Sequence, residues 1–270
     1  MIKTHYITKI FREHFAFLIF AILLCGGFQI LILSIFSTSE FLKLMESFMR
    51  QMPPQMQLFM GEEFIGQFTI NGIAAFGYNH PIVLIFFSMI AIMLPARHIG
   101  SEIEEGTLEL ILSLPVKRLT IIFSIWIFTI FTILILLGGC WLGTTWGIHL
   151  NPESVDLPFI NIFKIGLNLA VLMLTINAYT FFIAAYSREG GKVALRAAGI
   201  TLFFYFFNYA AKIWLAIQPL KQFTIFYYYQ PQLLMTGQMS FLRNITVLLT
   251  LTFIFLVIAF RRINRRDIPG

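Results

Sequence analysis

The sequence predicts an all-α membrane protein with six transmembrane helices and one amphipathic helix between the second and third spans. Of its 270 residues, 58% are hydrophobic and only 12% are charged. Soluble domains carry about twice that share of charge. The apolar residues also gather in runs near the roughly 20 residues that a membrane-spanning helix needs. These runs lie at about 15–37, 81–96, 119–147, 159–186, 196–217 and 242–260, and we interpret residues 1–270 as a single transmembrane domain.

The chain before the second span offers two amphipathic segments. Residues 1–14 are basic with apolar residues on one side, which predicts an N-terminal interfacial helix. The apolar run after it is too long for the core of a cleavable signal peptide, so we expect it to remain as the first span. Between residues 41 and 52 a helical apolar stripe is followed by Pro53 and Pro54, which would end a helix.

Basic residues predict the orientation. If six spans place both termini on one side, then thirteen of the 19 lysines and arginines lie on that side. The positive-inside rule makes it the cytoplasm. We therefore expect a multi-pass protein of the cell (cytoplasmic) membrane with both termini cytoplasmic. The positive charge forms no ordered stripe of the kind that binds nucleic acid, so no nucleic-acid partner is predicted.

The charged segment from Arg97 to Arg118, RHIGSEIEEGTLELILSLPVKR, interrupts the apolar runs. On a helix, Glu102, Glu105 and Glu109 share one face, and a second face is largely apolar. Gly106 would weaken this helix in the middle, and Pro115 would end it. These residues alone fit a solvated acidic helix as well as a docking surface for a partner.

Part of this segment, EIEEGTLELILSLPVKR, resembles the signature between the second and third spans of ABC-2 type ABC-transporter permeases. The resemblance implies a permease subunit of an ATP-driven exporter, in which this segment is a cytoplasmic coupling helix that docks on a separate ATPase subunit. It implies no catalytic residue here, and a transporter of two permeases, as a homodimer or with a related sister subunit, on two ATP-binding cassette subunits. No cofactor is expected in this chain, and ATP and Mg would bind the partner ATPase. The expected coupling residues are Glu102, Glu105, Gly106, Thr107, Leu108, Glu109, Ser113 and Pro115.

Polar residues within the fourth and fifth spans fall on one face of each helix. Two interpretations remain open: hydrogen bonds between helices, or a substrate path or dimer seam. The third span contains Gly139, Gly143 and Gly147 at four-residue spacing, which allows close helix packing within the subunit or across a dimer. The polar sets are Asn161, Lys164, Asn168 and Thr175 in the fourth span, and Thr201, Tyr205, Asn208 and Lys212 in the fifth.

The sequence also argues against a source of energy within this chain. No Asp or Glu falls inside a predicted span, whereas ion-coupled carriers usually place carboxylates there. The chain has no P-loop motif, and its five histidines are scattered, so neither an ATPase, another enzyme nor a metal site is predicted. The alternatives are an ion-driven secondary carrier or channel without an ATPase partner, and a structural membrane protein that uses the acidic helix for docking.

Overall fold

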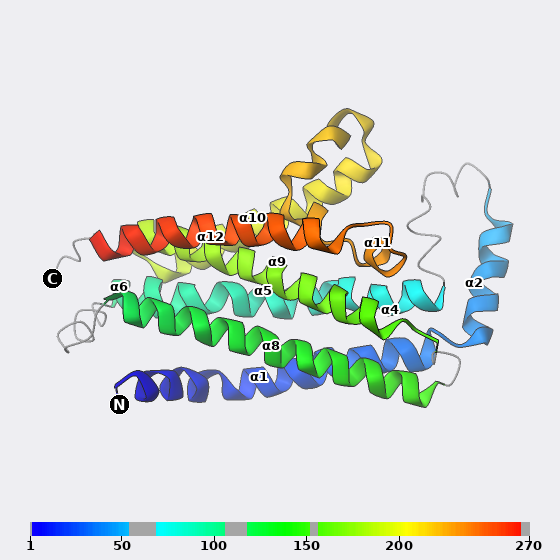
Figure 1. The fold of residues 1–270 in the computed structure, drawn as a ribbon, viewed down its shortest axis with the longest axis horizontal. Helices are drawn as coiled ribbons and strands as arrows, with labels where there is room; N and C mark the ends of the chain where they lie inside the picture. Colours follow the sequence, from blue (N-terminus) through cyan, green and yellow to red (C-terminus); the bar gives the residue numbers. More distant parts are fainter. Residues whose placement is uncertain (1, 54–68, 106–117, 152–155, 266–270) are drawn as a thin grey trace.

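The computed structural model describes residues 2–53, 69–105, 118–151 and 156–265, and the secondary structure within these ranges is entirely helical. Six helical stretches are long and apolar enough to cross a membrane, and they lie side by side in an elongated bundle (Figure 1). The all-α fold with six spans is therefore confirmed. The stretches are Ile10–Ile35, Ile70–Glu104, Leu119–Leu150, Phe159–Tyr186, Gly190–Ile213 and Phe241–Arg265.

The helices of this bundle differ in length and type. The long ones are α1 (Ile2–Ile35), α8 (Arg118–Leu150), α9 (Phe159–Tyr186), α10 (Gly190–Ile213) and α12 (Phe241–Arg265). The second span is assembled from α4 (Ile70–Asn79), α5 (Pro81–Pro95), the π-helical η2 (Ala96–Ser101) and the single turn α6 (Glu102–Glu104). The other short elements are α2 (Ser39–Gln51), the 3₁₀ helices η4 (Leu215–Phe223) and η5 (Ile225–Tyr228), and α11 (Pro231–Met235).

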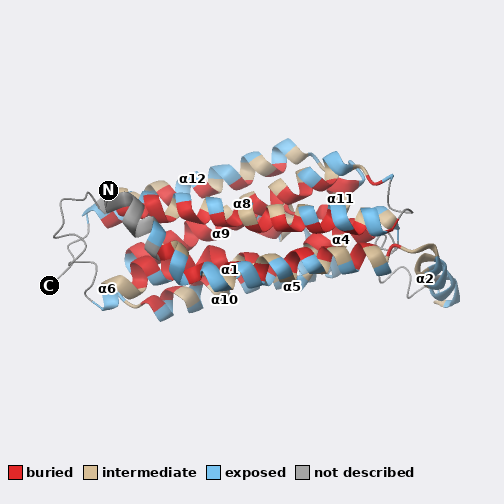
Figure 2. Cartoon of the chain, turned by 90° about the horizontal axis from the view of Figure 1, so that it is seen from below, coloured by how far each residue is buried: buried red, intermediate tan, exposed pale blue. Residues whose placement is uncertain are grey.

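The two ends of the bundle carry different elements. The start of α1, the end of α12 and α6 lie at one end, whereas α2 and α11 lie at the other (Figure 1). Buried residues line the inside of the bundle, and α2 stands apart with its residues largely exposed (Figure 2). Leu44 and Phe48, from the apolar stripe noted in the sequence, are 59% and 53% exposed. The stripe therefore does not pack into the helical bundle of this chain.

The second span is longer than the predicted 81–96, because α4 extends it before Pro81. Small residues such as Ala74 and Ala75 allow α4 to pack inside the bundle, and the Tyr78 hydroxyl lies 2.9 Å from Thr144 Oγ1. His80 breaks the helix, and its Nδ1 accepts a hydrogen bond from the Ile82 amide at 3.3 Å. Polar and glycine residues lower the hydropathy of α4, so the sequence predicted these residues as part of the loop before the second span.

The first and fifth spans also differ from those expected, and α8 and α12 extend past the predicted ends of the third and sixth, at 147 and 260, to Leu150 and Arg265. The N-terminal residues continue into the first span as one helix, α1, rather than forming a separate interfacial helix. The fifth span was expected at 196–217, but α10 begins at Gly190 and ends at Ile213. Trp214 leaves the helical conformation, and η4 then projects from the bundle (Figure 1). The glycines at the start of α10 resembled a polar turn in the sequence.

The glycine repeat of the third span packs against α1 within the same subunit. A Cβ atom on Gly143 would lie 2.2 Å from the carbonyl oxygen of Gly26, and one on Gly139 would lie 2.8 Å from Ile22 Cγ2. Contacts this short exclude any side chain larger than hydrogen unless the helices move apart. The buried thiols of Cys25 and Cys140 lie in the same core. Of the two interpretations of this repeat, the structure supports packing within the subunit.

This contact predicts that alanine substitutions at two glycines of α8 have different effects on stability. We expect Gly143→Ala to lower the free energy of unfolding by about 1–3 kcal/mol, as overpacking does. Gly138→Ala should leave stability unchanged or raise it, because nothing lies within 4 Å of its added Cβ and alanine favours a helix. Thermal unfolding of the full chain in detergent measures both, and equal melting temperatures for the two variants would contradict the α1–α8 contact.

Candidate functional site

The acidic segment begins as a direct continuation of the second span. After Pro95 the helix widens into η2, tightens into α6 and reaches Glu105. Glu102 and Glu105 are therefore the two predicted coupling residues that the structure places. The other predicted coupling residues lie outside the described residues: Gly106, Thr107, Leu108, Glu109, Ser113 and Pro115.

Glu102 and Glu105 have different surroundings. The side chain of Glu102 is only 13% exposed, and its Oε1 lies 3.6 Å from Nδ1 of His98, one turn earlier. Glu105 follows the last residue of α6 and is exposed. Of these two carboxylates, Glu105 is the one presented to solvent, whereas Glu102 points back toward His98 of η2.

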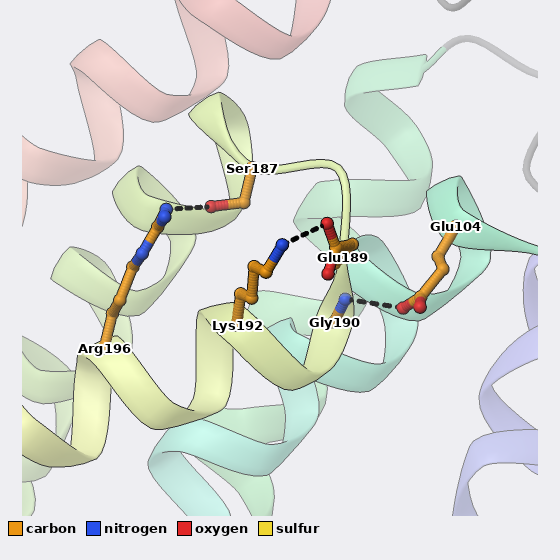
Figure 3. A network of polar contacts seen from close by, with 6 residues as sticks. All are labelled: Glu104, Ser187, Glu189, Gly190, Lys192 and Arg196. Carbon is orange, nitrogen blue, oxygen red and sulfur yellow. Dashed lines mark hydrogen bonds and ion pairs between the residues drawn. The ribbon is translucent and has the colours of Figure 1, made fainter.

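Glu104 joins the acidic segment to the fifth span. Its Oε2 accepts a hydrogen bond from the Gly190 amide at 2.9 Å, at the first turn of α10 (Figure 3). The N-cap residue of α10, Glu189, makes no side-chain cap of its own. A carboxylate at this position satisfies a helix amide and complements the helix dipole. The sequence interpretation missed Glu104 because it lies off the face shared by the other acids.

The backbones of η2 and α10 also touch directly. A Cβ atom on Gly100 would lie 2.7 Å from the Cα of Gly190, and one on Gly190 would lie 2.6 Å from the amide nitrogen of Ser101. Glycine at both positions is what lets the two helices approach this closely. The signal in the sequence was the Gly190–Gly191 pair, which we interpreted only as part of a polar turn.

The turn between α9 and α10 is held by its own polar side chains. Arg196 Nη1 donates a hydrogen bond to Ser187 Oγ at 3.2 Å, and Lys192 forms an ion pair with Glu189 (Figure 3). The ion pair is about half exposed, and such pairs contribute little to stability. The Arg196 bond ties the second turn of α10 back to Ser187, the residue that follows α9.

A groove with a volume of about 1040 Å³ runs between α5 and α10. Its lining includes Pro81 at the start of α5 and reaches Glu105 and Gly190, so the groove extends along most of the span. The walls are mainly apolar. Besides those three residues, Leu84, Ile85, Ser88, Met89, Ile92 and Met93 line it from α5, and Ala194, Ala198, Thr201, Leu202, Tyr205 and Phe206 line it from α10.

Two of the polar residues predicted in the fifth span line this groove. The Thr201 hydroxyl is also hydrogen-bonded to the Tyr179 hydroxyl of α9. Tyr205 packs edge to face on Phe226, with ring centroids 5.4 Å apart. Asn208 instead accepts a hydrogen bond from Thr224 at 3.2 Å and does not line the groove.

The polar residues of the fourth span face other helices. Asn161 Nδ2 donates to the Met235 carbonyl at 3.0 Å, and Thr175 Oγ1 lies 3.0 Å from Thr252 Oγ1 of α12. Asn168 is fully buried. Asn161 and Thr175 therefore bond to α11 and α12, whereas the Asn168 side-chain amide has no hydrogen-bond partner within the described part of the chain. The structure does not bring the two polar sets into one site.

The glycine contact predicts that an added methyl group destabilises the protein at Gly190 but not at the adjacent Gly191. Gly190→Ala should separate α10 from η2, because its Cβ would collide with the Ser101 backbone. We expect a loss of about 1–3 kcal/mol in the free energy of unfolding. Gly191→Ala is the matched control, since nothing lies within 4 Å of its Cβ. Thermal unfolding in detergent measures both, and a Gly190→Ala protein as stable as the Gly191→Ala protein would refute the contact.

Comparison with known proteins adds one match. A family model described as "ABC-2 family transporter protein" matches residues 12–268. No curated protein and no solved structure matches the chain. The family match covers all six apolar helices almost completely, together with the acidic segment between the second and third. The chain belongs to the ABC-2 family of transporter proteins and is a membrane permease of an ABC transporter.

Proposed function

We propose that this permease is the transmembrane subunit of an exporter, and that a separate ATP-binding cassette subunit docks on its acidic segment. The observation that carries the proposal is the connection of this segment to both walls of the groove. It continues α5 directly through η2, and it contacts α10 through Gly100, Glu104 and Gly190.

This arrangement supports a mechanical role for the segment. Packed helices move as rigid bodies, and close-packed contacts pass displacement on rather than absorbing it. Force applied beyond Glu105 would therefore reach α5 along the chain and α10 across the glycine contact. Both helices line the groove, so their relative movement would change its width. The acidic residues transmit force in this proposal and perform no chemistry.

The groove is proposed as one half of the substrate path. Its rim is apolar and open, with Ile85, Met89, Leu202 and Phe206 between 44% and 63% exposed. A second permease copy, either identical or a related sister subunit, would close the open side. Thr201 and Tyr205 would then face the substrate or the dimer seam. Asn161, Asn168, Thr175 and Asn208, which were predicted for the same role, would support the helices behind it.

The partner ATPase would supply the energy, and the distribution of basic residues indicates the orientation. ATP and Mg would bind the ATPase subunit. By sequence, thirteen of the 19 lysines and arginines belong to the segments predicted on the side of the two termini. The described parts of these segments lie at the end of the bundle that carries α6 (Figure 1), which supports a cytoplasmic location for that end and for both termini. The chain would then lie in the cell membrane with its acidic segment facing an intracellular ATPase.

Charge reversal on the segment tests this proposal. Glu105→Arg places a positive charge where an acidic surface would meet its partner, and like charges at an interface cost several kcal/mol. We expect at least tenfold less ATPase to co-purify in mild detergent, and ATP-dependent export to fall in proportion. Gly106→Leu should likewise uncouple ATP hydrolysis from transport while the spans remain inserted.

Glu40→Arg is the matched control, because Glu40 is an exposed acid on α2 at the opposite end of the bundle. It should retain both the ATPase and export. If Glu105→Arg keeps its ATPase and exports at the parent rate, the docking role of this residue is wrong. Robust transport by the chain with no ATPase present would instead favour the ion-driven carrier or channel.

A further inference from the structure

Three side chains at the end of the bundle that carries α6 come together from two distant parts of the sequence. Glu13 and His14 belong to α1, and His98 belongs to η2. One ligand atom from each lies within 4.8 Å of the other two. We propose that these three residues bind a divalent transition-metal ion of the zinc class and so clamp α1 to the root of the acidic segment.

The two imidazoles have the separation that a shared ion requires. Nε2 of His14 lies 3.2 Å from Nε2 of His98, and the two rings are perpendicular at 89°. Two nitrogen ligands at about 2.0–2.1 Å from a tetrahedral zinc ion are about 3.3 Å apart. Both residues are only 4% exposed. Without an ion, the same two nitrogens share one proton in a hydrogen bond.

Glu102 orients His98 for this role. Its carboxylate Oε1 lies 3.6 Å from Nδ1 of His98, on the side of the ring away from His14. This distance exceeds a hydrogen bond, but the carboxylate attracts a proton on Nδ1 electrostatically, and that tautomer leaves the lone pair of Nε2 directed toward the shared position. Metal-binding histidines commonly use their second nitrogen in this way, with a carboxylate as partner. Glu102 is therefore a positioning residue and not a ligand.

Glu13 completes the ligand set from the solvent side. Its side chain is 29% exposed, and Oε2 lies 3.8 Å from Nη2 of Arg97, whose own side chain is 58% exposed. So long and exposed an ion pair contributes little, and the largely exposed arginine can yield its place to a metal ion. Two imidazoles and one carboxylate form a ligand set that zinc accepts, with a fourth position open to water.

The position of the site gives binding a consequence. His98 lies in the π-helical η2, between α5 and the acidic turn α6, and α1 packs beside it. An ion that binds this arrangement would favour the conformation in which α1 and η2 are together. The metal would thus regulate the mobility of the acidic segment. Neither this claim nor its test depends on an ATPase partner or on export.

Zinc binding by the full chain tests the proposal. The protein is purified in detergent through a tag without histidine, stripped with a chelator and titrated calorimetrically with zinc. We expect about one zinc ion per chain and a higher melting temperature with zinc. His14→Ala and His98→Ala should each weaken binding at least tenfold and abolish the thermal shift. His149→Ala is the matched control, since His149 is exposed at the end of α8.

Two further variants separate binding from folding. His98→Gln keeps a polar side chain of similar size but should still lose zinc. Glu102→Gln removes the positioning carboxylate, and we expect it to weaken zinc binding about 10–100-fold, as loss of such partners typically does. If the parent binds no zinc, or if a His14→Ala His98→Ala double variant binds it as well as the parent, the site is refuted and the histidine pair is only a hydrogen bond.

Discussion

The contact between Gly100 of η2 and Gly190 of α10 joins the acidic segment to the fifth span, and the coupling that we propose depends on it. Because neither residue has a side chain, the two backbones meet directly, and Glu104 adds a charged hydrogen bond to the same helix start. Without this contact, the described part of the segment, up to Glu105, would lose its direct link to α10. With it, one short segment is connected to both walls of the groove.

The number and helical nature of the spans could be predicted because lipid imposes a local rule. Every backbone polar group must be satisfied within its own segment, so a long apolar run has to be a helix. For α9 this rule gave the observed bounds, Phe159–Tyr186. It failed for α4, where Asn71, Gly72 and Gly77 lower the hydropathy of a helix that is nevertheless buried by its neighbours. Burial there follows from tertiary packing, which a count of apolar residues does not register.

Site residues were predictable only where one helix or one motif carried the signal. The spacing of Glu102 and Glu105 was visible, but their different exposure depends on where η2 ends and on what His98 contacts. His14 lies 84 residues from its partner His98, and Glu104 lies 86 residues from its partner Gly190, so no periodicity reveals these two contacts. The same holds for the polar face of α9. Its residues were visible as a set, but only the packed structure shows that Asn161 meets α11 and Thr175 meets α12.

In the proposed mechanism, movement of the acidic segment changes the width of the groove between α5 and α10. Spin labels on Met89→Cys and Leu202→Cys measure it most directly, because both positions line the groove and are exposed, whereas the native Cys25 and Cys140 are fully buried. The distance between the labels is compared, in the complex with the ATPase, before and after ATP is trapped by blocking hydrolysis. We expect a shift in this distance that disappears in Gly190→Ala. A distance that is the same in both nucleotide states would contradict it.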